Sequence, residues 1–284
     1  MTVGFCKLAL FLAASAILWG QGGRGGPGSD ALREGTRLDL EGKTAEAKAV
    51  FQKAIDSAAT PAAKANAQRA MAMSYAFDAD CKNTGKYEQR VIDYWATQEE
   101  NQPGNAFYQE GEMANEAARV CIDAGDLDAA AAWYEKGQDL GLKEPNISPG
   151  RTYLWQFRTE HARARIAARR GKKAEAQKHV AAAKAVLDHL QKADPALYQQ
   201  QQVFYPYLTG YVALYTGDYQ TALDDFQKAN TGDAFIQCLI GMTYEKLGDN
   251  EKAMEWYRKA SSVSAHNPPA AFAKPFTRKK LGGA

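Results

Sequence analysis

The sequence predicts an all-α protein: an α-solenoid of about six antiparallel helix pairs with a C-terminal capping helix. Three observations lead to this prediction. Alanine, glutamine and lysine are abundant and β-branched residues are scarce, which favours helix along the whole chain. Apolar residues recur three and four positions apart in segments that glycines separate, as in pairs of amphipathic helices. The third observation is an internal repeat near the C-terminal end.

The repeat lies in residues 203–260, where one pattern occurs twice. A glycine is followed seven residues later by a second glycine, and alanine, an aromatic residue and alanine come 5, 9 and 12 positions after that. Small residues at fixed offsets let two helices approach closely, and the aromatic ring fills the space above them. The pattern therefore predicts two closely packed helix pairs. Its members are Gly210, Gly217, Ala222, Phe226 and Ala229 in the first copy, and Gly241, Gly248, Ala253, Tyr257 and Ala260 in the second.

The same pattern recurs towards the N-terminus with less fidelity. A good copy occupies residues 31–55, with Gly35 and Phe51 in the places of the first glycine and the aromatic residue. Val180 replaces the aromatic residue in one central copy, and a degraded copy contains Tyr87 and Tyr94. A glycine between two helical segments indicates a turn, so six such glycines predict six helix pairs. The predicted turn glycines are Gly42, Gly85, Gly125, Gly171, Gly217 and Gly248.

This pattern resembles the tetratricopeptide repeat, a helix-turn-helix unit of about 34 residues. The resemblance is closest over residues 203–260, fair over 31–55 and loose between them. The early tryptophan of the family's first helix and the proline that closes its second helix are missing, and the turn glycines are unevenly spaced. The resemblance implies a superhelix that binds proteins or peptides on its concave face, and the departures imply an irregular pitch.

In the family the first helix of each unit lines the concave face, which implies a peptide-binding groove in this chain. Four of the implied groove residues lie three or four positions apart on one helix face, and three of them are arginines: Arg158, His161, Arg165 and Arg169. Guanidinium groups bind carboxylates bidentately, so this stripe beside a tyrosine wall suits an extended acidic segment. The basic run also fits a solvated helix face, and the tyrosines also fit packing between units. The implied groove residues are Asn115, Arg119, Arg158, His161, Arg165, Arg169, Phe204, Tyr207, Tyr211 and Tyr215.

The N-terminal segment has the composition of an export signal. Lys7 precedes the uncharged apolar run from Leu8 to Trp19, which is shorter than the ~20 residues of a spanning helix but suits a signal peptide. We therefore predict a secreted or periplasmic protein without stable membrane insertion after cleavage, which would occur after Ala16 or near Gly20. The predicted divisions are a signal peptide (1–20), a glycine-rich flexible tether (21–28), the repeat domain (29–267), and the capping helix with its basic tail (268–284).

Three cysteines follow the predicted signal peptide: Cys81, Cys121 and Cys238. The first two each stand four residues before a predicted turn glycine, which places them at equivalent positions in neighbouring units. Helix axes pack about 8–10 Å apart, whereas a disulfide needs Cα atoms within about 7 Å. The sequence therefore favours two buried free thiols over a bridge.

No set of residues typical of catalysis or metal binding comes together in the sequence. The four histidines are scattered, no phosphate-binding or nucleophile motif is present, and the net charge of +2 does not indicate nucleic acid. We predict a non-catalytic scaffold without cofactor or metal that binds a protein or peptide partner, such as an acidic segment. Two alternatives stay open: a helical domain that binds a small molecule or glycan through the aromatic wall, and a structural spacer in an envelope assembly.

Overall fold

The computed structural model describes residues 27–282, and this part of the chain is helical without strands. The predicted signal peptide and most of the predicted tether lie outside the described residues, whose first helix begins at Pro27. None of the described helices is long and apolar enough to cross a bilayer. The six antiparallel pairs are α1 (Pro27–Glu41) with α2 (Thr44–Asp56), α3 (Pro61–Phe77) with α4 (Cys81–Ala96), α5 (Pro103–Ala124) with α6 (Leu127–Gly141), α7 (Pro149–Arg169) with α8 (Lys173–Ala193), α10 (Tyr205–Tyr215) with α11 (Tyr219–Phe226), and α12 (Ala234–Leu247) with α13 (Asn250–Ser261).

Five of the six predicted turn glycines lie in the turns of these pairs. Each has a positive φ, between 71° and 88°, which costs glycine little and other residues about 1–2 kcal/mol. In three pairs an aspartate follows the glycine and caps the second helix, accepting a hydrogen bond from the backbone N–H three residues on. The glycines are Gly42, Gly125, Gly171, Gly217 and Gly248, and the capping residues are Asp126, Asp218 and Asp249.

The prediction that Gly85 forms the turn of the second pair is wrong. Gly85 lies inside α4, where its missing side chain makes room for the ring of Trp133 from the third pair. The turn is made instead by Ala79, whose φ is 55°, and Asp80 caps α4. The aspartate is the signal that identifies this turn, because it has the same place as the capping aspartates of three other pairs. With the turn moved, Glu88 falls on the aromatic position of the template.

The predicted contact between a small residue and an aromatic ring is confirmed in three pairs. A Cβ atom built on the first glycine of each template would lie 2.4–2.7 Å from the ring of the facing helix, so only glycine leaves room for it. All three rings are fully buried, and Ala222 and Ala253 are buried beside them. These contacts join the two helices of a pair. They are Gly35 with Phe51, Gly210 with Phe226, and Gly241 with Tyr257.

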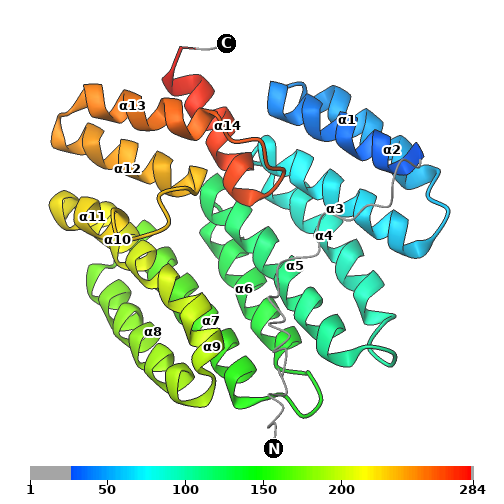
Figure 1. Ribbon diagram of the computed structural model, residues 1–284, viewed down its shortest axis with the longest axis horizontal. Coiled ribbons are helices and arrows are strands. Elements are labelled where there is room, and N and C mark those ends of the chain that lie inside the picture. Colours follow the sequence, from blue (N-terminus) through cyan, green and yellow to red (C-terminus); the bar gives the residue numbers. More distant parts are fainter. Residues whose placement is uncertain (1–26, 283–284) are drawn as a thin grey trace, which may run out of the picture.

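The first helices of successive pairs lie side by side: α1 contacts α3, α7 contacts α10, and α10 contacts α12. Two short helices, α9 (Pro195–Gln201) and the 3₁₀ helix η1 (Gln202–Phe204), connect α8 to α10. The predicted C-terminal helix is α14 (Pro268–Lys280). It packs on the last pair, as expected of a cap, and also contacts α3 and α5 near the other end of the stack. Figure 1 shows the pairs along an arc, with α14 in the interval between the first and last pairs.

Cys81 and Cys121 form a disulfide, so the preference for two free thiols is wrong. With the turn at Ala79, Cys81 is the first residue of α4, whereas Cys121 lies near the end of α5. The two residues therefore do not occupy equivalent positions, and their Cα atoms are 4.7 Å apart. The spacing of about 8–10 Å applies to equivalent positions on neighbouring first helices, which these two cysteines do not occupy. The remaining cysteine, Cys238, is buried as a free thiol.

Candidate functional site

The candidate site is built around Arg165 of α7, whose side chain is buried and only 5% exposed. Its guanidinium donates hydrogen bonds to the hydroxyl of Tyr207 on α10, at 2.9 Å, and to the hydroxyl of Tyr134 on α6. Burial raises the pKa of Tyr207 to about 12, so this hydroxyl stays protonated. Among the described residues no carboxylate forms an ion pair with Arg165. The buried cation is held by tyrosine hydroxyls and by the rings of Tyr134, Tyr207 and Tyr211, whose centroids lie 5.6–5.7 Å from the guanidinium.

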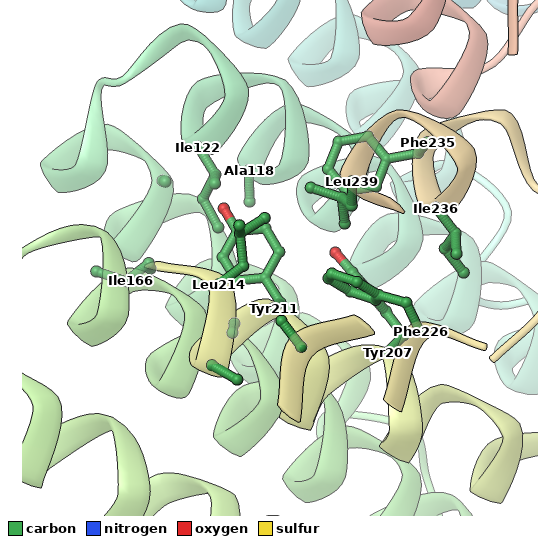
Figure 2. Packing of buried hydrophobic residues seen from close by; sticks show 14 of the residues in the cluster. Ala118, Ile122, Ile166, Tyr207, Tyr211, Leu214, Phe226, Phe235, Ile236 and Leu239 are labelled. Carbon is green, nitrogen blue, oxygen red and sulfur yellow. The ribbon is translucent and has the colours of Figure 1, made fainter. Parts of the chain in front are cut away.

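Arg169 extends the same arrangement by one helical turn. Its guanidinium donates to the hydroxyl of Tyr211, at 3.3 Å, and lies over the ring of Tyr215, 4.9 Å from the centroid. Arg165 and Arg169 of the predicted stripe are thus in direct contact with the predicted tyrosines. Packing from α5, α7 and α12 surrounds the tyrosines, as Figure 2 shows for Tyr207 and Tyr211 among Ala118, Ile166 and Phe235. Arg119 of α5 is close enough for its charge to act on Tyr207. We call Arg119, Arg165, Arg169, Tyr207, Tyr211 and Tyr215 the arginine–tyrosine cluster.

Asp123, in the last turn of α5, lies beside this cluster. Burial raises the pKa of its carboxyl to about 7, although Arg165, Arg119 and Arg169 all favour the charged form. The carboxyl is half-buried and forms no ion pair within the described chain. At neutral pH the three arginines are charged while Asp123 is only partly ionised, so the cluster carries excess positive charge.

His161 is the neutral member of this region. It is buried between the rings of Phe157 and Tyr207, whose centroids lie 5.8 and 5.1 Å from that of the imidazole. Burial, with the charges of Arg165 and Arg119, holds its pKa well below the ordinary value. The imidazole is therefore uncharged near neutral pH and adds no cation to the cluster.

Three other predicted groove residues, Arg158, Asn115 and Phe204, form no hydrogen bond with the arginine–tyrosine cluster in the part of the chain that the structure describes. Arg158 forms an ion pair with Glu112 and donates to the hydroxyl of Tyr108 at 3.2 Å, so its charge is already balanced. Asn115 is buried, with its amide oxygen against Gly137 of α6. Phe204 belongs to the 3₁₀ helix and is 45% exposed. Whether these side chains bind a peptide stays a prediction.

Sequence reasoning missed Asp123, Glu112 and Tyr134. Two of these residues lie on α5 at positions that match the predicted groove residues of α7: Glu112 occupies the place that Arg158 has on α7, and Asp123 the place of Arg169. The signal was therefore present but was read only for basic and aromatic residues. The role of Tyr134 as a hydroxyl partner of Arg165 depends on a contact between α6 and α7, which a pattern within one helix pair does not reveal.

The tyrosine wall offers little stacking surface to a sugar. Tyr211 is fully buried and Tyr207 is only 9% exposed, because they pack against each other and against neighbouring helices. A glycan needs open ring faces. The geometry therefore does not favour the alternative that the wall binds carbohydrate.

A match to a family model supports the resemblance seen in the sequence. Residues 236–267 match the tetratricopeptide repeat, and this segment holds nearly all of α12 and α13. The last helix pair is therefore similar to a tetratricopeptide repeat. A comparison with curated proteins gave no match. Repeats of this family generally mediate protein–protein interactions, which agrees with a solenoid whose first helices lie side by side.

Proposed function

We propose that the protein is an exported, non-catalytic scaffold that binds an acidic segment of a partner protein at the arginine–tyrosine cluster. The observation that carries the proposal is the group of three arginines for which the described chain supplies no ion-paired carboxylate. Buried or half-buried guanidinium groups are costly without an anion, and a partner carboxylate would supply one. The tyrosine hydroxyls hold Arg165 and Arg169 in place before the partner arrives, which reduces the entropy lost on binding.

The test uses the mature chain, beginning at residue 21, to capture partners from an extract of exported proteins. We expect Arg119→Glu combined with Arg169→Glu to abolish capture, since both side chains are half-buried and the change reverses their charge. Arg163→Glu is the control, because Arg163 lies on the same helix, is 52% exposed, and pairs only with Glu160. Capture by wild type should fall as salt rises. Equal capture by all three proteins would rule out the cluster as the binding site.

Export is supported by the apolar N-terminal run and independently by the disulfide between Cys81 and Cys121. Disulfides persist in oxidising compartments and are rare in the cytosol. We expect Leu12→Arg, which interrupts the apolar run, to retain the protein in the cytosol with both cysteines reduced. Fractionation followed by thiol labelling measures both effects, and oxidised Cys81 and Cys121 in the retained variant would remove this support.

A further inference from the structure

A pocket of about 170 Å³ lies between α14 and the facing helices α3 and α5, and it shares Asp123 with the surroundings of the arginine–tyrosine cluster. Its walls come from α3 and α5 on one side and from α14 on the other. All of its lining residues except Asp123 are apolar, and α14 contributes aromatic rings and prolines. The lining residues are Ala76, Phe77, Ala79, Val120, Asp123, Pro268, Ala271, Phe272, Pro275 and Phe276.

The α14 wall is firmly attached at both ends of the stack. Ala271 packs with the apolar residues of the first pairs, and Ala273 packs with those of the last pair. His266, just before α14, makes a 2.8 Å hydrogen bond with the buried carboxylate of Asp39. At the other end of the helix, Lys280 pairs with Glu245 of α12 at 2.7 Å. The pocket is therefore a fixed feature between α14 and the facing helices.

Two aromatic residues of the α14 wall are in contact with solvent. Phe272 and Phe276 are partly exposed although they stack on each other, with centroids 5.1 Å apart. Phe272 also packs on Phe235, which contacts Tyr207 of the arginine–tyrosine cluster. A space of this size with apolar walls suits a single large apolar side chain, which would be stabilised by removal from water.

Asp123 connects the pocket to the arginine–tyrosine cluster. Asp123 lines the pocket, and its carboxyl interacts electrostatically with Arg165, Arg119 and Arg169. A ligand whose apolar group fills the pocket therefore has its next groups close to uncompensated positive charge. This combination of shape and charge is specific for an apolar residue adjoined by carboxylates.

We propose that the pocket is the anchor site for an apolar, preferably aromatic, side chain of the partner, and that acidic residues next to this anchor bind Arg119 and Arg169. The proposal rests on the proposed function that the arginine–tyrosine cluster binds an acidic protein segment. It assigns α14 a role in binding, because this helix supplies half of the pocket wall. The carboxylate of Asp123 would then repel the carboxylates of the partner and lower the affinity.

Three short peptides with blocked termini test the proposal on the mature chain by NMR or calorimetric titration. The probes are acetyl-Phe-Glu-Glu-amide, acetyl-Phe-Gln-Gln-amide and acetyl-Ala-Glu-Glu-amide. We expect the first to bind about tenfold more tightly than either of the others, because only it carries both the ring and the carboxylates. Equal binding of the phenylalanine and alanine peptides, or no binding of any probe at millimolar concentration, would overturn the proposal.

Variants assign the two contributions to their residues. Ala76→Leu should fill the pocket and remove the advantage of phenylalanine, while Arg119→Ala should remove the advantage of the glutamates. Asp123→Asn should tighten the glutamate peptides severalfold and leave the glutamine peptide unchanged, a gain that damage to the fold would not produce. A tightening of the glutamine peptide by the same factor would contradict the assigned role of Asp123.

The outcomes separate this inference from the proposed function. If Arg119→Ala weakens the glutamate peptides but Ala76→Leu has no effect, the acidic partner stands and the anchor pocket is wrong. If Ala76→Leu removes binding but Arg119→Ala has no effect, the pocket binds apolar groups and the acidic partner is wrong.

Discussion

The last two helix pairs and the second pair follow one template but are stabilised by different contacts. In the last two pairs, Gly210 and Gly241 receive the buried rings of Phe226 and Tyr257. In the second pair Glu88 has the place of the ring. Its carboxyl is fully buried, and burial together with Glu116 raises its pKa well above the ordinary value.

An ion pair and a disulfide connect the second pair to the third, and the described residues of the last two pairs form no such links with each other. Arg69 of α3 forms an ion pair with Glu116 of α5, and the disulfide joins Cys81 to Cys121. The two kinds of pair show that the template positions do not require one kind of side chain. They require only that the facing surfaces of the two helices are complementary in shape. Where the large ring is absent, polar and covalent links between neighbouring pairs replace part of its contribution.

The largest expected effect tests the aromatic contact. We expect Phe226→Ala to lower the free energy of unfolding by about 3–5 kcal/mol, since it leaves a cavity against Gly210. Urea unfolding of the mature chain measures the loss. Phe204→Ala is the control, because this phenylalanine is 45% exposed and its removal should cost less than about 0.5 kcal/mol. A loss below 1 kcal/mol for Phe226→Ala would show that the ring is not the main contact of its pair.

The next effect concerns the disulfide between Cys81 and Cys121, which joins the second pair to the third. The disulfide closes a loop with a sequence separation of 40 residues, and a loop of that size stabilises by about 3–4 kcal/mol in the chain-entropy treatment. We expect Cys81→Ala with Cys121→Ala to lose most of this in urea unfolding. A reducing agent should destabilise wild type and leave the double variant unchanged. Equal sensitivity of both proteins to the reducing agent would contradict the assignment.

A smaller effect is the pH dependence of stability that the buried carboxyl of Glu88 causes, which an aromatic ring in its place would not cause. Because the pKa of Glu88 is raised in the folded state, its stability contribution is complete below the ordinary value of 4.5 and is lost as pH rises towards the folded pKa. Glu88→Gln removes this titration. We therefore expect the variant to be more stable than wild type at pH 8 by about 1 kcal/mol or more, with a smaller advantage at pH 5.

Thermal unfolding at several pH values between 5 and 8 measures this difference. Comparing the two proteins at each pH matters because His161, whose pKa is lowered, changes stability in the opposite direction as pH falls. Glu251→Gln, an exposed change in the last pair, is the control and should show no such trend. A constant difference between wild type and Glu88→Gln across the range would exclude titration of Glu88 as the cause.

The smallest effect tests the turn of the second pair. Ala79 has a φ of 55°, which is strained for alanine, and glycine in this place would match the other pairs. We expect Ala79→Gly to raise stability by about 0.5–1 kcal/mol, because the relief of strain exceeds the added entropy of the unfolded chain. Gly125→Ala, at a φ of 88° with open space around it, should cost about the same amount. A destabilising Ala79→Gly would contradict the strain argument.

Local pattern predicted much of the fold and part of the candidate site. Five turn glycines and the three glycine–ring contacts were correct because both depend on residues in one helix pair. The stripe of Arg165 and Arg169 beside Tyr207 and Tyr211 was also predicted, and the structure brings these side chains together. The second pair was misread because its turn has alanine in place of glycine.

The sequence by itself determined that the chain forms paired helices, since spacing, small residues and capping act within a few turns of helix. Tertiary structure alone decided the pairing of Cys81 with Cys121, the burial of Arg165 and the position of α14 against α3 and α5. These features depend on how the stack curves. Small differences in packing at each pair accumulate along the arc, so residues far apart in sequence meet only when all the pairs are in place.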